Sequence, residues 1–544
     1  MIVANAVGRA LRLSGVDTVF GVVGSGNFHV TNALVAGGAR FVAARHEGGA
    51  ATMADAYARV SGNLGVLSVH QGPGLTNALT GITEAAKSRT PLLVLAAEVT
   101  SPRSNFWIDQ AALATAVGAV PERIHSPETA LADAARACRR AVAERRTVLL
   151  SLPLDVQAAE CPNLWADPEI AGPPPPVPEI GGLADALSTA RRPVFIGGRG
   201  ARLAGAREPL RILAARTGAL LATSAVARGL FAGDLFDLDV SGGFASPVAA
   251  ELIRGADLIV GWGCALNMWT LRHGNLVGAD TVVVQVDLDT DALGAHQPVR
   301  LGITGDVTAV ALAADAELAR RGHSSAGYRS PELADRLARE VRWRDVPYDD
   351  DSDGSRIDPR TLSIALDDLL PAERTVAVDS GNFMGYPAMY LGVPDVDGLV
   401  FTQAFQSIGL GLATAIGAAV ARPDRLTVAA LGDGGALMGV AELETAVRLG
   451  LGMLIVVYDD EAYGAEVHHF GPAGHRLDTV TFPPVDLAAV GRGFGCEAVT
   501  VLRTEDLSAV TAWLAGPRDR PMVVDAKVTT GRPSWWLEEA FRGH

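Results

Sequence analysis

Cysteine is scarce in this chain, and the few cysteines are widely separated. Only four occur among 544 residues, no Cys-X-X-Cys pair is present, and Cys264 lies in an apolar stretch typical of a core position. Clustered cysteines are what structural zinc sites and small disulfide-bonded domains require. The sequence therefore argues against both kinds of stabilisation and favours a reducing compartment.

The chain also lacks positive net charge and a membrane-spanning run. Its net charge is −15, which disfavours nucleic acid and anionic membranes because both would be repelled. Any anionic substrate must then be held by local groups. The longest apolar stretch, Ala404–Ala421, carries polar residues and three glycines, so we expect a buried helix and its approach there. No basic and apolar leader opens the sequence, so we expect a cytoplasmic protein.

What the sequence does contain is a regular alternation of strand-like and helix-like segments. The length indicates about three domains, and the alternation falls into three blocks. A proline-rich stretch, Ala171–Pro178, and a polar stretch, Asp349–Ser355, separate the blocks. We predict three consecutive doubly wound parallel-sheet α/β domains, over residues 1–170, 180–345 and 356–544. The expected strands are Val19–Val23, Phe41–Ala44, Leu64–His70, Pro91–Ala96, Pro193–Ile196, Ala219–Thr223, Leu258–Gly261, Thr281–Val286, Thr375–Val378, Leu426–Leu431, Met453–Tyr458 and Pro521–Ala526.

A glycine-rich motif in the third block indicates a diphosphate site. The strand that ends at Leu431 runs into Gly432-Asp433-Gly434-Gly435 and then a helix. Such glycines let backbone N–H groups approach a diphosphate, and a helix start favours its negative charge. The next strand ends in Asp459-Asp460-Glu461-Ala462. Because neighbouring parallel strands end at the same edge of a sheet, Asp433 and Asp460 are expected to converge on one cation. Mg²⁺ prefers such mixed carboxylate and phosphate ligands.

With these segments in view, the whole chain resembles the thiamine-diphosphate enzymes of the acetolactate synthase, pyruvate decarboxylase and benzoylformate decarboxylase group. In that family the motif runs from Gly-Asp-Gly to a pair of asparagines, which Asp459-Asp460 replaces here. The resemblance implies thiamine diphosphate and Mg²⁺ as cofactors, with Asp433, the Asp460 side chain and the Ala462 carbonyl as metal ligands. An aspartate in place of asparagine should tighten metal binding. Gly381 and Asn382 are further cofactor-binding candidates.

The first block supplies a candidate for the pyrimidine end of the cofactor. Glu47 opens a helix after a strand, where an acidic residue also suits the helix dipole. The resemblance assigns Glu47 a proton-sharing contact with the pyrimidine N1′, which promotes formation of the thiazolium ylide. Ile408 is similar to the family's apolar wedge beneath the pyrimidine, although an ordinary core position accounts for it equally well. The resemblance also implies a homodimer or homotetramer with active sites at the subunit interface.

His70 is the candidate for proton transfer. It ends a strand at the carboxyl edge of the first sheet, and a near-neutral pKa suits a general acid or base. Benzoylformate decarboxylase resembles this chain in carrying a histidine and a serine at the positions of His70 and Ser25. Phe106, by contrast, stands where acetolactate synthases carry glutamine. Further substrate candidates are Gln71, Glu466 and His468, with His469 and His273 as weaker ones.

The central block contains a short glycine turn, Gly197–Gly200. Such a turn alone is weak evidence for a dinucleotide. Acetolactate synthases bind flavin in this domain, whereas decarboxylases leave it empty. We favour an empty central domain over one that holds FAD.

The resemblance implies decarboxylation of a 2-oxo acid to an enamine, followed by carboligation to an aldehyde or ketone acceptor, as in acetolactate synthase. A simple 2-oxo acid decarboxylase is the alternative that His70 favours. A 2-hydroxyacyl-CoA lyase shares the fold, but the sequence ends soon after Trp535-Trp536, without the long lid expected of it. A cofactor-binding pseudoenzyme is suggested by Asp459-Asp460 and disfavoured by the retention of Glu47 and Asp433.

Overall fold

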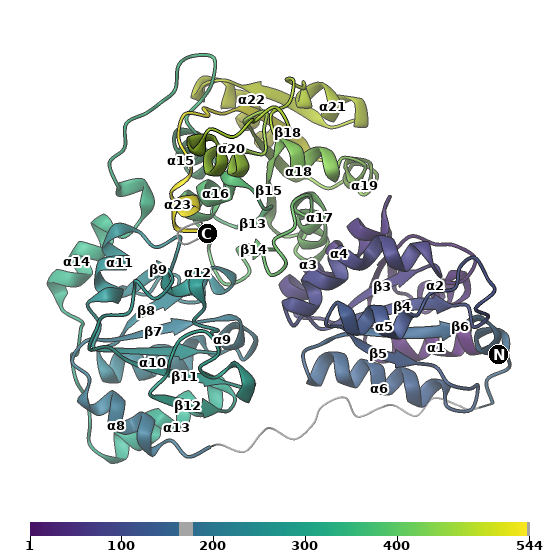
Figure 1. Cartoon of the computed structure of the whole chain (residues 1–544), viewed down its shortest axis with the longest axis horizontal. Helices are drawn as coiled ribbons and strands as arrows, with labels where there is room; N and C mark the ends of the chain where they lie inside the picture. Colours follow the sequence, from purple (N-terminus) through teal and green to yellow (C-terminus); the bar gives the residue numbers. More distant parts are fainter. Residues whose placement is uncertain (163–177, 541–544) are drawn as a thin grey trace.

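The chain folds into three lobes, each built on one sheet (Figure 1). The computed structural model describes residues 1–162 and 178–540. Each lobe holds a six-stranded sheet, and all pairings between the named strands are parallel. The prediction of three parallel-sheet α/β domains is thereby confirmed. The predicted linker Ala171–Pro178 lies outside the described residues apart from Pro178, and the domain limits stay predictions.

The elements of the three domains follow one another along the chain. The first domain has the strand order β2-β1-β3-β4-β6-β5 and consists of α1 (Val3–Leu13), β1 (Thr18–Gly21), α2 (Phe28–Ala36), β2 (Arg40–Ala43), α3 (Glu47–Ser61), β3 (Gly65–Val69), α4 (Pro73–Lys87), β4 (Leu92–Glu98), α5 (Gln110–Ala116), β5 (Val120–Arg123), α6 (Ala130–Ala143), β6 (Thr147–Pro153) and α7 (Leu154–Ala158). The second has the order β12-β11-β10-β7-β8-β9 and consists of α8 (Gly181–Thr189), β7 (Pro193–Gly197), α9 (Arg199–Leu203), α10 (Arg207–Thr217), β8 (Leu220–Thr223), β9 (Asp237–Val240), α11 (Pro247–Arg254), β10 (Leu258–Trp262), α12 (Met268–Leu271), β11 (Val282–Asp287), β12 (Leu301–Thr304), α13 (Val307–Arg320) and α14 (Pro331–Glu340). The third has the order β14-β13-β15-β16-β18-β17 and consists of α15 (Pro359–Leu369), β13 (Arg374–Val378), α16 (Gly385–Tyr390), β14 (Leu399–Phe401), α17 (Gly411–Ala421), β15 (Leu426–Gly432), α18 (Asp433–Met438), α19 (Glu442–Arg448), β16 (Leu454–Asp459), α20 (Gly464–Phe470), α21 (Leu487–Phe494), β17 (Glu497–Val501), α22 (Ser508–Ala515), β18 (Met522–Lys527) and α23 (Trp535–Ala540).

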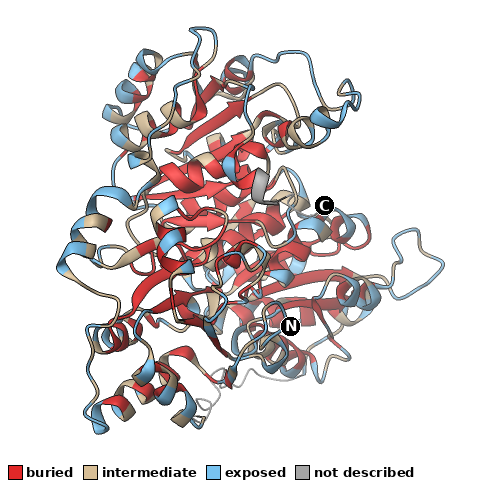
Figure 2. Cartoon of the chain, turned by 60° about the vertical axis from the view of Figure 1, so that its left-hand side comes forward, coloured by how far each residue is buried: buried red, intermediate tan, exposed pale blue. Residues whose placement is uncertain are grey.

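The sheets are covered on both faces, which is why their strands are almost continuously apolar. In β3, Val66 packs into one buried cluster with α1 and α6, while Leu67 and Val69 pack into another with α3 and α4. Figure 2 shows buried residues filling the sheets and exposed residues on the outer turns of the helices. Central parallel strands have nearly continuous apolar sequences because helices lie against both of their faces. Among the described residues, no helix is both long and apolar enough to cross a membrane.

The first and third domains are joined through α3 and α17. Both helices are rich in alanine and glycine, and their buried residues belong to a single cluster. A side chain on Gly417 would collide with the backbone carbonyl of Met53. Small residues at this contact therefore let the two backbones approach closely. The expected buried helix in Ala404–Ala421 is α17, preceded by an irregular segment.

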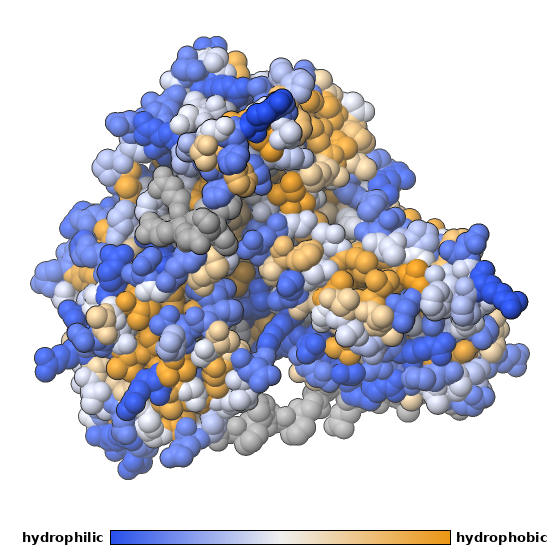
Figure 3. Space-filling model, viewed as in Figure 1, coloured by the Kyte–Doolittle hydropathy of each residue, from blue (hydrophilic) through white to orange (hydrophobic). Residues whose placement is uncertain are grey.

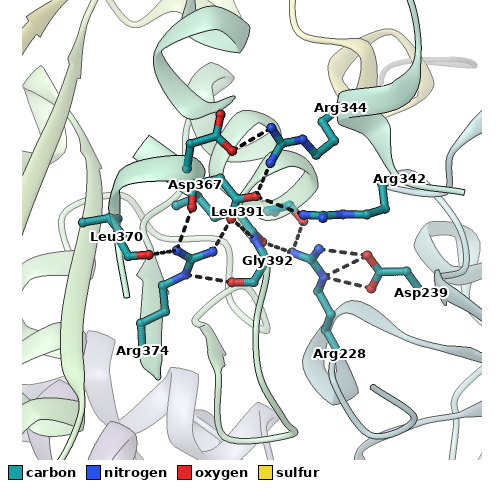
Figure 4. A network of polar contacts seen from close by, with 11 residues as sticks. Arg228, Asp239, Arg342, Arg344, Asp367, Leu370, Arg374, Leu391 and Gly392 are labelled. Atoms are coloured by element: carbon teal, nitrogen blue, oxygen red, sulfur yellow. Dashed lines mark hydrogen bonds and ion pairs between the residues drawn. The ribbon is translucent and has the colours of Figure 1, made fainter. Parts of the chain in front are cut away.

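A buried ionic network joins the second domain to the third (Figure 4). Arg228 pairs with Asp239 at 2.8 Å and donates to the carbonyls of Ala388 at 2.7 Å and Leu391 at 2.9 Å. Beside it, the Asp367 carboxylate accepts hydrogen bonds from Arg342, Arg344 and Arg374, and from the Gly392 N–H. Buried charges in this number need their partners, because an unpaired one would be costly. The network therefore fixes how the central domain sits against the third.

Candidate functional site

Asp433 and Asp460 lie at the same edge of the third sheet. The strands β15 and β16 are neighbours, with Gly432 paired to Tyr458. Asp433 directly follows Gly432, and Asp460 lies two residues after Tyr458. Both aspartates and Ala462 line one cavity of about 1530 Å³. The arrangement is the one that the strand spacing predicts.

The electrostatics of the two aspartates indicate a missing positive charge. Burial raises the pKa of Asp433 to about 7, and the nearby charge of Asp459 adds to the shift. Burial raises the pKa of Asp460 to about 8, and the charge of Asp433 adds to that shift. Two buried carboxyl groups whose ionisation is disfavoured by burial and by neighbouring carboxylates bind a divalent cation well, because the cation offsets both effects. The donor set therefore fits Mg²⁺.

The two adjacent aspartates have different surroundings. The Asp459 carboxylate is paired with the Lys527 ammonium and accepts the Glu461 N–H at 3.1 Å. Lys527 also lies 3.2 Å from Asp525. Asp459 thus has its own counter-ion, whereas Asp460 faces the cavity. Only Asp460 of this pair is suited to be a metal ligand.

The backbone around Ala462 is held in place by a neighbouring segment. The Phe482 N–H donates to the Glu461 carbonyl and the Tyr463 N–H donates to the Val480 carbonyl, both at 2.8 Å. These bonds use the residues on either side of Ala462. In the part of the chain that the structure describes, no hydrogen bond uses the Ala462 carbonyl itself. That carbonyl is therefore available as a ligand.

The glycines of the motif are required by close approaches. A Cβ on Gly434 would lie 2.6 Å from the Tyr463 ring, and one on Gly435 would lie 2.5 Å from the Asp379 carboxylate. A Cβ on Gly464 would collide with the Asp460 carboxylate. Gly381 and Gly432 line the same cavity. The result is a wall of exposed backbone beside two carboxylates, as a diphosphate and its metal ion require.

Asp379 fixes the segment that carries the wedge candidate. Its buried carboxylate accepts the Gly409 N–H at 3.0 Å and the Ser380 N–H at 2.8 Å, and burial raises its pKa to about 6. Gly409 follows Ile408, which lines the cavity. Sequence reasoning missed Asp379, although it stands directly after the strand β13 at the carboxyl edge, where such a residue could have been sought.

Asn382 holds the C-terminal segment of the chain. Its side-chain oxygen accepts the Ser534 N–H at 3.1 Å, and its carbonyl accepts the Ser534 hydroxyl at 2.6 Å and the Trp536 indole N–H at 2.9 Å. Trp536 and Asn382 both line the cavity. Asn382 therefore places a tryptophan on the cavity wall.

The candidates of the first domain gather at the carboxyl edge of its own sheet. Glu47 is the first residue of α3, and the Asn77 amide donates to its carboxylate at 3.0 Å. His70 accepts the Gly26 N–H at Nδ1, at 3.2 Å, so a neutral ring carries its proton on Nε2. Burial lowers the pKa of His70, and the charge of Glu47 partly opposes the shift. The neutral imidazole is thus favoured, which suits a general base.

Three other candidates lie around His70. The Phe106 ring meets the His70 ring edge to face, with centroids 5.5 Å apart. Ser25 is exposed in the loop between two glycines that pack against His70 and Gln71. Gln71 is buried, and its side-chain oxygen has no partner among the described residues. A polar atom left this way is available to a ligand.

Within a single chain, the site candidates of the first domain do not reach the cavity that holds those of the third domain. Glu47, Ser25, His70, Gln71 and Phe106 are all absent from the lining of the cavity that holds Asp433 and Asp460. Glu442 of the third domain does contact the start of α3, where it accepts the N–H groups of Arg45 and His46 at 3.1 and 3.0 Å. That contact positions Glu47 but does not place it in the cavity.

The helix α20 contributes its first three residues, Gly464, Ala465 and Glu466, to the cavity lining. Glu466 lines the cavity, whereas His468 does not, and burial lowers the pKa of His468. His469 meets the Phe470 ring at 4.6 Å between centroids. His273 lies in the central domain with a φ of +52° and is not part of the lining either. Within residues 1–162 and 178–540, no group of three or more His, Cys, Asp or Glu side chains could hold a metal ion.

The central glycine turn is explained by packing. The Gly198 N–H donates to the Trp262 carbonyl at 2.9 Å and the Gly200 N–H donates to the Gly263 carbonyl at 2.8 Å. A Cβ on Gly200 would lie 2.6 Å from Gly263. Two of the turn's N–H groups are therefore already bonded, and the turn needs no dinucleotide to account for its glycines.

Comparison with known proteins identifies the family. Three family models match: the N-terminal TPP binding domain of thiamine pyrophosphate enzymes over residues 1–118, the central domain over 180–314, and the C-terminal TPP binding domain over 379–526. The chain is 30% identical to a probable 2-ketoarginine decarboxylase of Pseudomonas aeruginosa, over 90% of this chain and 88% of that protein. The chain belongs to the thiamine pyrophosphate enzyme family. The resemblance inferred from the sequence motifs is thereby confirmed.

Other members of the thiamine pyrophosphate enzyme family are similar along nearly the whole chain. A sulfoacetaldehyde acetyltransferase of Alcaligenes xylosoxydans xylosoxydans is 28% identical, over 91% of this chain and 87% of its own length. The large subunit of acetolactate synthase isozyme 2 of Escherichia coli is 28% identical, over 93% and 92%. The solved structure of a thiamine diphosphate-dependent 4-hydroxybenzoylformate decarboxylase of Rhodococcus jostii shares the fold, with a TM-score of 0.81, 22% identity, and coverage of 97% of this chain and 99% of that one.

Proposed function

We propose that this thiamine pyrophosphate enzyme uses thiamine diphosphate and Mg²⁺ to decarboxylate a 2-oxo acid and to join the product to a second carbonyl compound. The proposal rests on one observation: Asp433, Asp460 and the glycines of Gly432–Gly435 all line one large cavity. When bound, thiamine diphosphate supplies an electron sink for cleavage of the bond to the carboxylate.

Each group of the site has a task in this proposal. Asp433, Asp460 and the Ala462 carbonyl would hold Mg²⁺, and the backbone at Gly432–Gly435 would receive the diphosphate. Glu47 shares a proton with the pyrimidine ring. His70, kept neutral by burial, exchanges a proton with the reacting oxygen or carbon of the substrate.

The size of the cavity supports carboligation. About 1530 Å³ exceeds the usual range for a small-ligand pocket, roughly 300–1000 Å³. After a cofactor and a 2-oxo acid are accommodated, room is left for an acceptor. Acetolactate synthase and sulfoacetaldehyde acetyltransferase are among the similar proteins, and both names describe group transfer.

A simple decarboxylase is the second candidate. His70 beside Phe106 favours it, because a group that relays a proton to the reacting carbon would release an aldehyde before an acceptor adds. The probable 2-ketoarginine decarboxylase among the similar proteins agrees with this reading.

We infer that a second copy of the chain completes the site. Apolar side chains are exposed around the His70 edge of the first domain and around Asp433, where four of them border a shallow hollow of about 290 Å³. Figure 3 shows apolar surface on both domains. Exposed apolar area of this kind favours association. The residues are Val23, Phe28, Phe106 and Trp107 on the first domain, and Leu437, Met438, Phe482 and Val485 on the third.

The test of the reaction is product identification. The protein, with thiamine diphosphate and Mg²⁺, is incubated with a panel of 2-oxo acids, each with and without an aldehyde acceptor. Hydroxyketone or hydroxy acid products support carboligation, and free aldehyde alone supports the decarboxylase. Absence of calorimetric binding of thiamine diphosphate with Mg²⁺ would contradict both.

The test of the shared site is complementation between two inactive variants. Glu47→Gln and Asp433→Asn each disable one half of the site. If the halves come from different chains, co-expressed variants form mixed dimers in which one of the two sites is intact. Activity should then return, and the continued inactivity of verified mixed dimers would contradict a site shared between chains.

A further inference from the structure

A buried ionic cluster lies where all three domains meet. Arg59 of α3 pairs with Asp55 at 2.6 Å and with Glu84 of α4 at 2.9 Å, and both carboxylates are fully buried. Arg59 also donates to the Phe401 carbonyl of the third domain at 3.1 Å. Arg202 of the central domain donates to the Arg59 carbonyl at 2.7 Å. The cluster therefore ties the three domains together at one point.

Glu84 extends this cluster to the chain segment that follows β14. Its two carboxylate oxygens accept the N–H of Ala404 at 3.2 Å and the N–H of Phe405 at 2.7 Å. The segment continues to Ile408, which lines the cavity. Since a buried carboxylate and two backbone bonds fix this segment, the direction of the neighbouring Gln403 is fixed as well.

Gln403 carries an unused amide in the cavity wall. It lines the cavity, and its side-chain nitrogen and oxygen are both inaccessible to water and without a partner among the described residues. A buried amide that makes none of its hydrogen bonds is costly, roughly 1–3 kcal/mol for each unmet group. Its cost is offset if a ligand supplies the missing partner.

Arg199 and Lys87 line the same cavity, and neither makes an ion pair among the described residues. Arg199, at the start of α9, makes no hydrogen bond or ion pair within the described residues, although it lies within electrostatic reach of Arg59 and Glu84. Lys87, at the end of α4, has no ion pair there either, and its ammonium lies 5.8 Å from the centre of the Phe405 ring. Each domain thus contributes one group: Lys87, Arg199 and Gln403.

We propose that Arg199, Lys87 and Gln403 form a recognition patch for a second acidic group on the substrate, a carboxylate, sulfonate or phosphate at the end remote from the 2-oxo acid. This inference rests on the proposed function and names its substrate class. Two cations attract the acidic group, and the Gln403 amide donates a hydrogen bond that fixes its direction.

The neighbouring cations show why this patch differs from ordinary surface charge. Arg89 lines the same cavity but is paired with Asp289. Arg202 is paired with Asp397 at 3.1 Å. In a chain of net charge −15, with 61 acidic and 46 basic side chains, this cavity gathers local positive charge, since Arg145 and Arg146 also line it without an ion pair among the described residues. Local groups of this kind are what an acidic protein needs in order to hold an anionic substrate.

The test compares matched substrates and matched variants. The substrates are 2-oxo dicarboxylates of four to six carbons, their terminal sulfonate and phosphonate analogues, and neutral 2-oxo acids of equal length. The variants are Arg199→Gln, Gln403→Leu and, as the control, Arg89→Gln. The wild-type protein should prefer the acidic series, and the preferred head group identifies which acid the patch receives.

Arg199→Gln should lower kcat/KM for the acidic substrates about 10–100-fold, mainly through KM, and leave the neutral substrates within about 3-fold. Gln403→Leu should act in the same direction, and Arg89→Gln should change neither series. Arg199→Gln should not unfold the protein, since burial and the charge of Arg59 lower the pKa of Arg199 to about 10 and its removal relieves that repulsion.

Equal use of acidic and neutral 2-oxo acids, unchanged by Arg199→Gln, would overturn the inference while the proposed function stands. If no 2-oxo acid is turned over, the proposed function fails, and calorimetry on the protein with thiamine diphosphate and Mg²⁺ decides the patch separately. Binding of glutarate but not pentanoate, lost in Arg199→Gln, would support the patch. Absence of that difference would overturn it.

Discussion

Replacing Asp460 by asparagine should stabilise the cofactor-free protein and lower its affinity for Mg²⁺. In the structure burial and the charge of Asp433 raise the pKa of Asp460 to about 8, and burial and the charge of Asp459 raise the pKa of Asp433 to about 7. Both groups favour the proton over the negative charge. Asparagine keeps an oxygen donor and removes one of the two charges.

The pH dependence of this effect has a definite sign. Below about pH 4 both carboxyl groups are protonated in the folded and unfolded chain, so they cost nothing. Between about pH 4 and 8 the unfolded chain releases these protons and the folded chain retains them, so stability falls as pH rises and levels off above about pH 8. Asp460→Asn should therefore raise the free energy of unfolding by about 2–4 kcal/mol at pH 8, and by little at pH 4.

Chemical denaturation of the metal-free protein at pH 5, 6.5 and 8 measures the effect, and calorimetric titration with Mg²⁺ and thiamine diphosphate measures the metal. Mg²⁺ should stabilise the wild-type protein more at pH 8 than at pH 6, because it favours the ionised carboxylates. A variant with the wild-type pH profile and unchanged Mg²⁺ affinity would refute the reasoning.

The neighbouring residue supplies a matched control. Asp459→Asn removes the ion-pair partner of Lys527, and the loss of that ion pair opposes the relief of the repulsion that Asp459 exerts on Asp433 and Asp460. It should destabilise the protein at pH 8, by about 1–3 kcal/mol, because the buried ammonium keeps only Asp525 as a counter-ion. The same sign for both substitutions would contradict the different roles assigned to the two aspartates.

Glu47→Gln should abolish exchange of the bound cofactor's C2 proton and leave the circular dichroism spectrum unchanged; normal exchange would rule out its assignment. His70→Ala should slow turnover by roughly 10²–10⁴-fold if the imidazole transfers a proton, and an unchanged rate would make His70 structural. Gly417→Val should lower the unfolding free energy by about 3 kcal/mol or more, since its side chain collides with Met53, whereas Gly493→Ala, with open space around it, should change it little. Equal denaturation midpoints for these two glycine variants would contradict the close contact between α3 and α17.

How far the sequence predicted the fold depended on where each strand lies in its sheet. Central strands such as β15 and β16 are continuous apolar runs, and they were predicted to within a few residues. The strands that escaped prediction are β5, β6, β9, β12, β14 and β17, and all except β6 lie at a sheet edge. Edge strands are covered less completely, so their apolar pattern is weaker: β5 reads Val-Pro-Glu-Arg and β9 reads Asp-Leu-Asp-Val. The interior strand β6 is apolar and fully buried, and its pattern was legible.

The site residues likewise fall into those that the sequence predicts and those that it does not. Asp433, Asp460 and the glycines form a local motif, because two neighbouring strands deliver them to one edge, and this part was predictable. Lys87, Arg199 and Gln403 carry no local signal. Lys87 ends a helix, Arg199 starts one, and Gln403 lies in an irregular segment, so only the packing of three domains brings them to one cavity. Their lack of partners is likewise a property of the folded chain.

The two ends of the site thus depend on different parts of the assembly. The proposed metal ligands and the proposed recognition patch line a cavity formed by one chain, and Arg59 and Arg228 hold its domains together through hydrogen bonds to backbone carbonyls of the third domain. Glu47 and His70 do not reach that cavity and would have to come from a second copy. Under these two proposals, selection of the substrate would be set within one chain, whereas its chemical conversion would require two. Because α3 carries both Arg59, in the ionic cluster where the three domains meet, and Glu47 as its first residue, this single helix connects the two requirements.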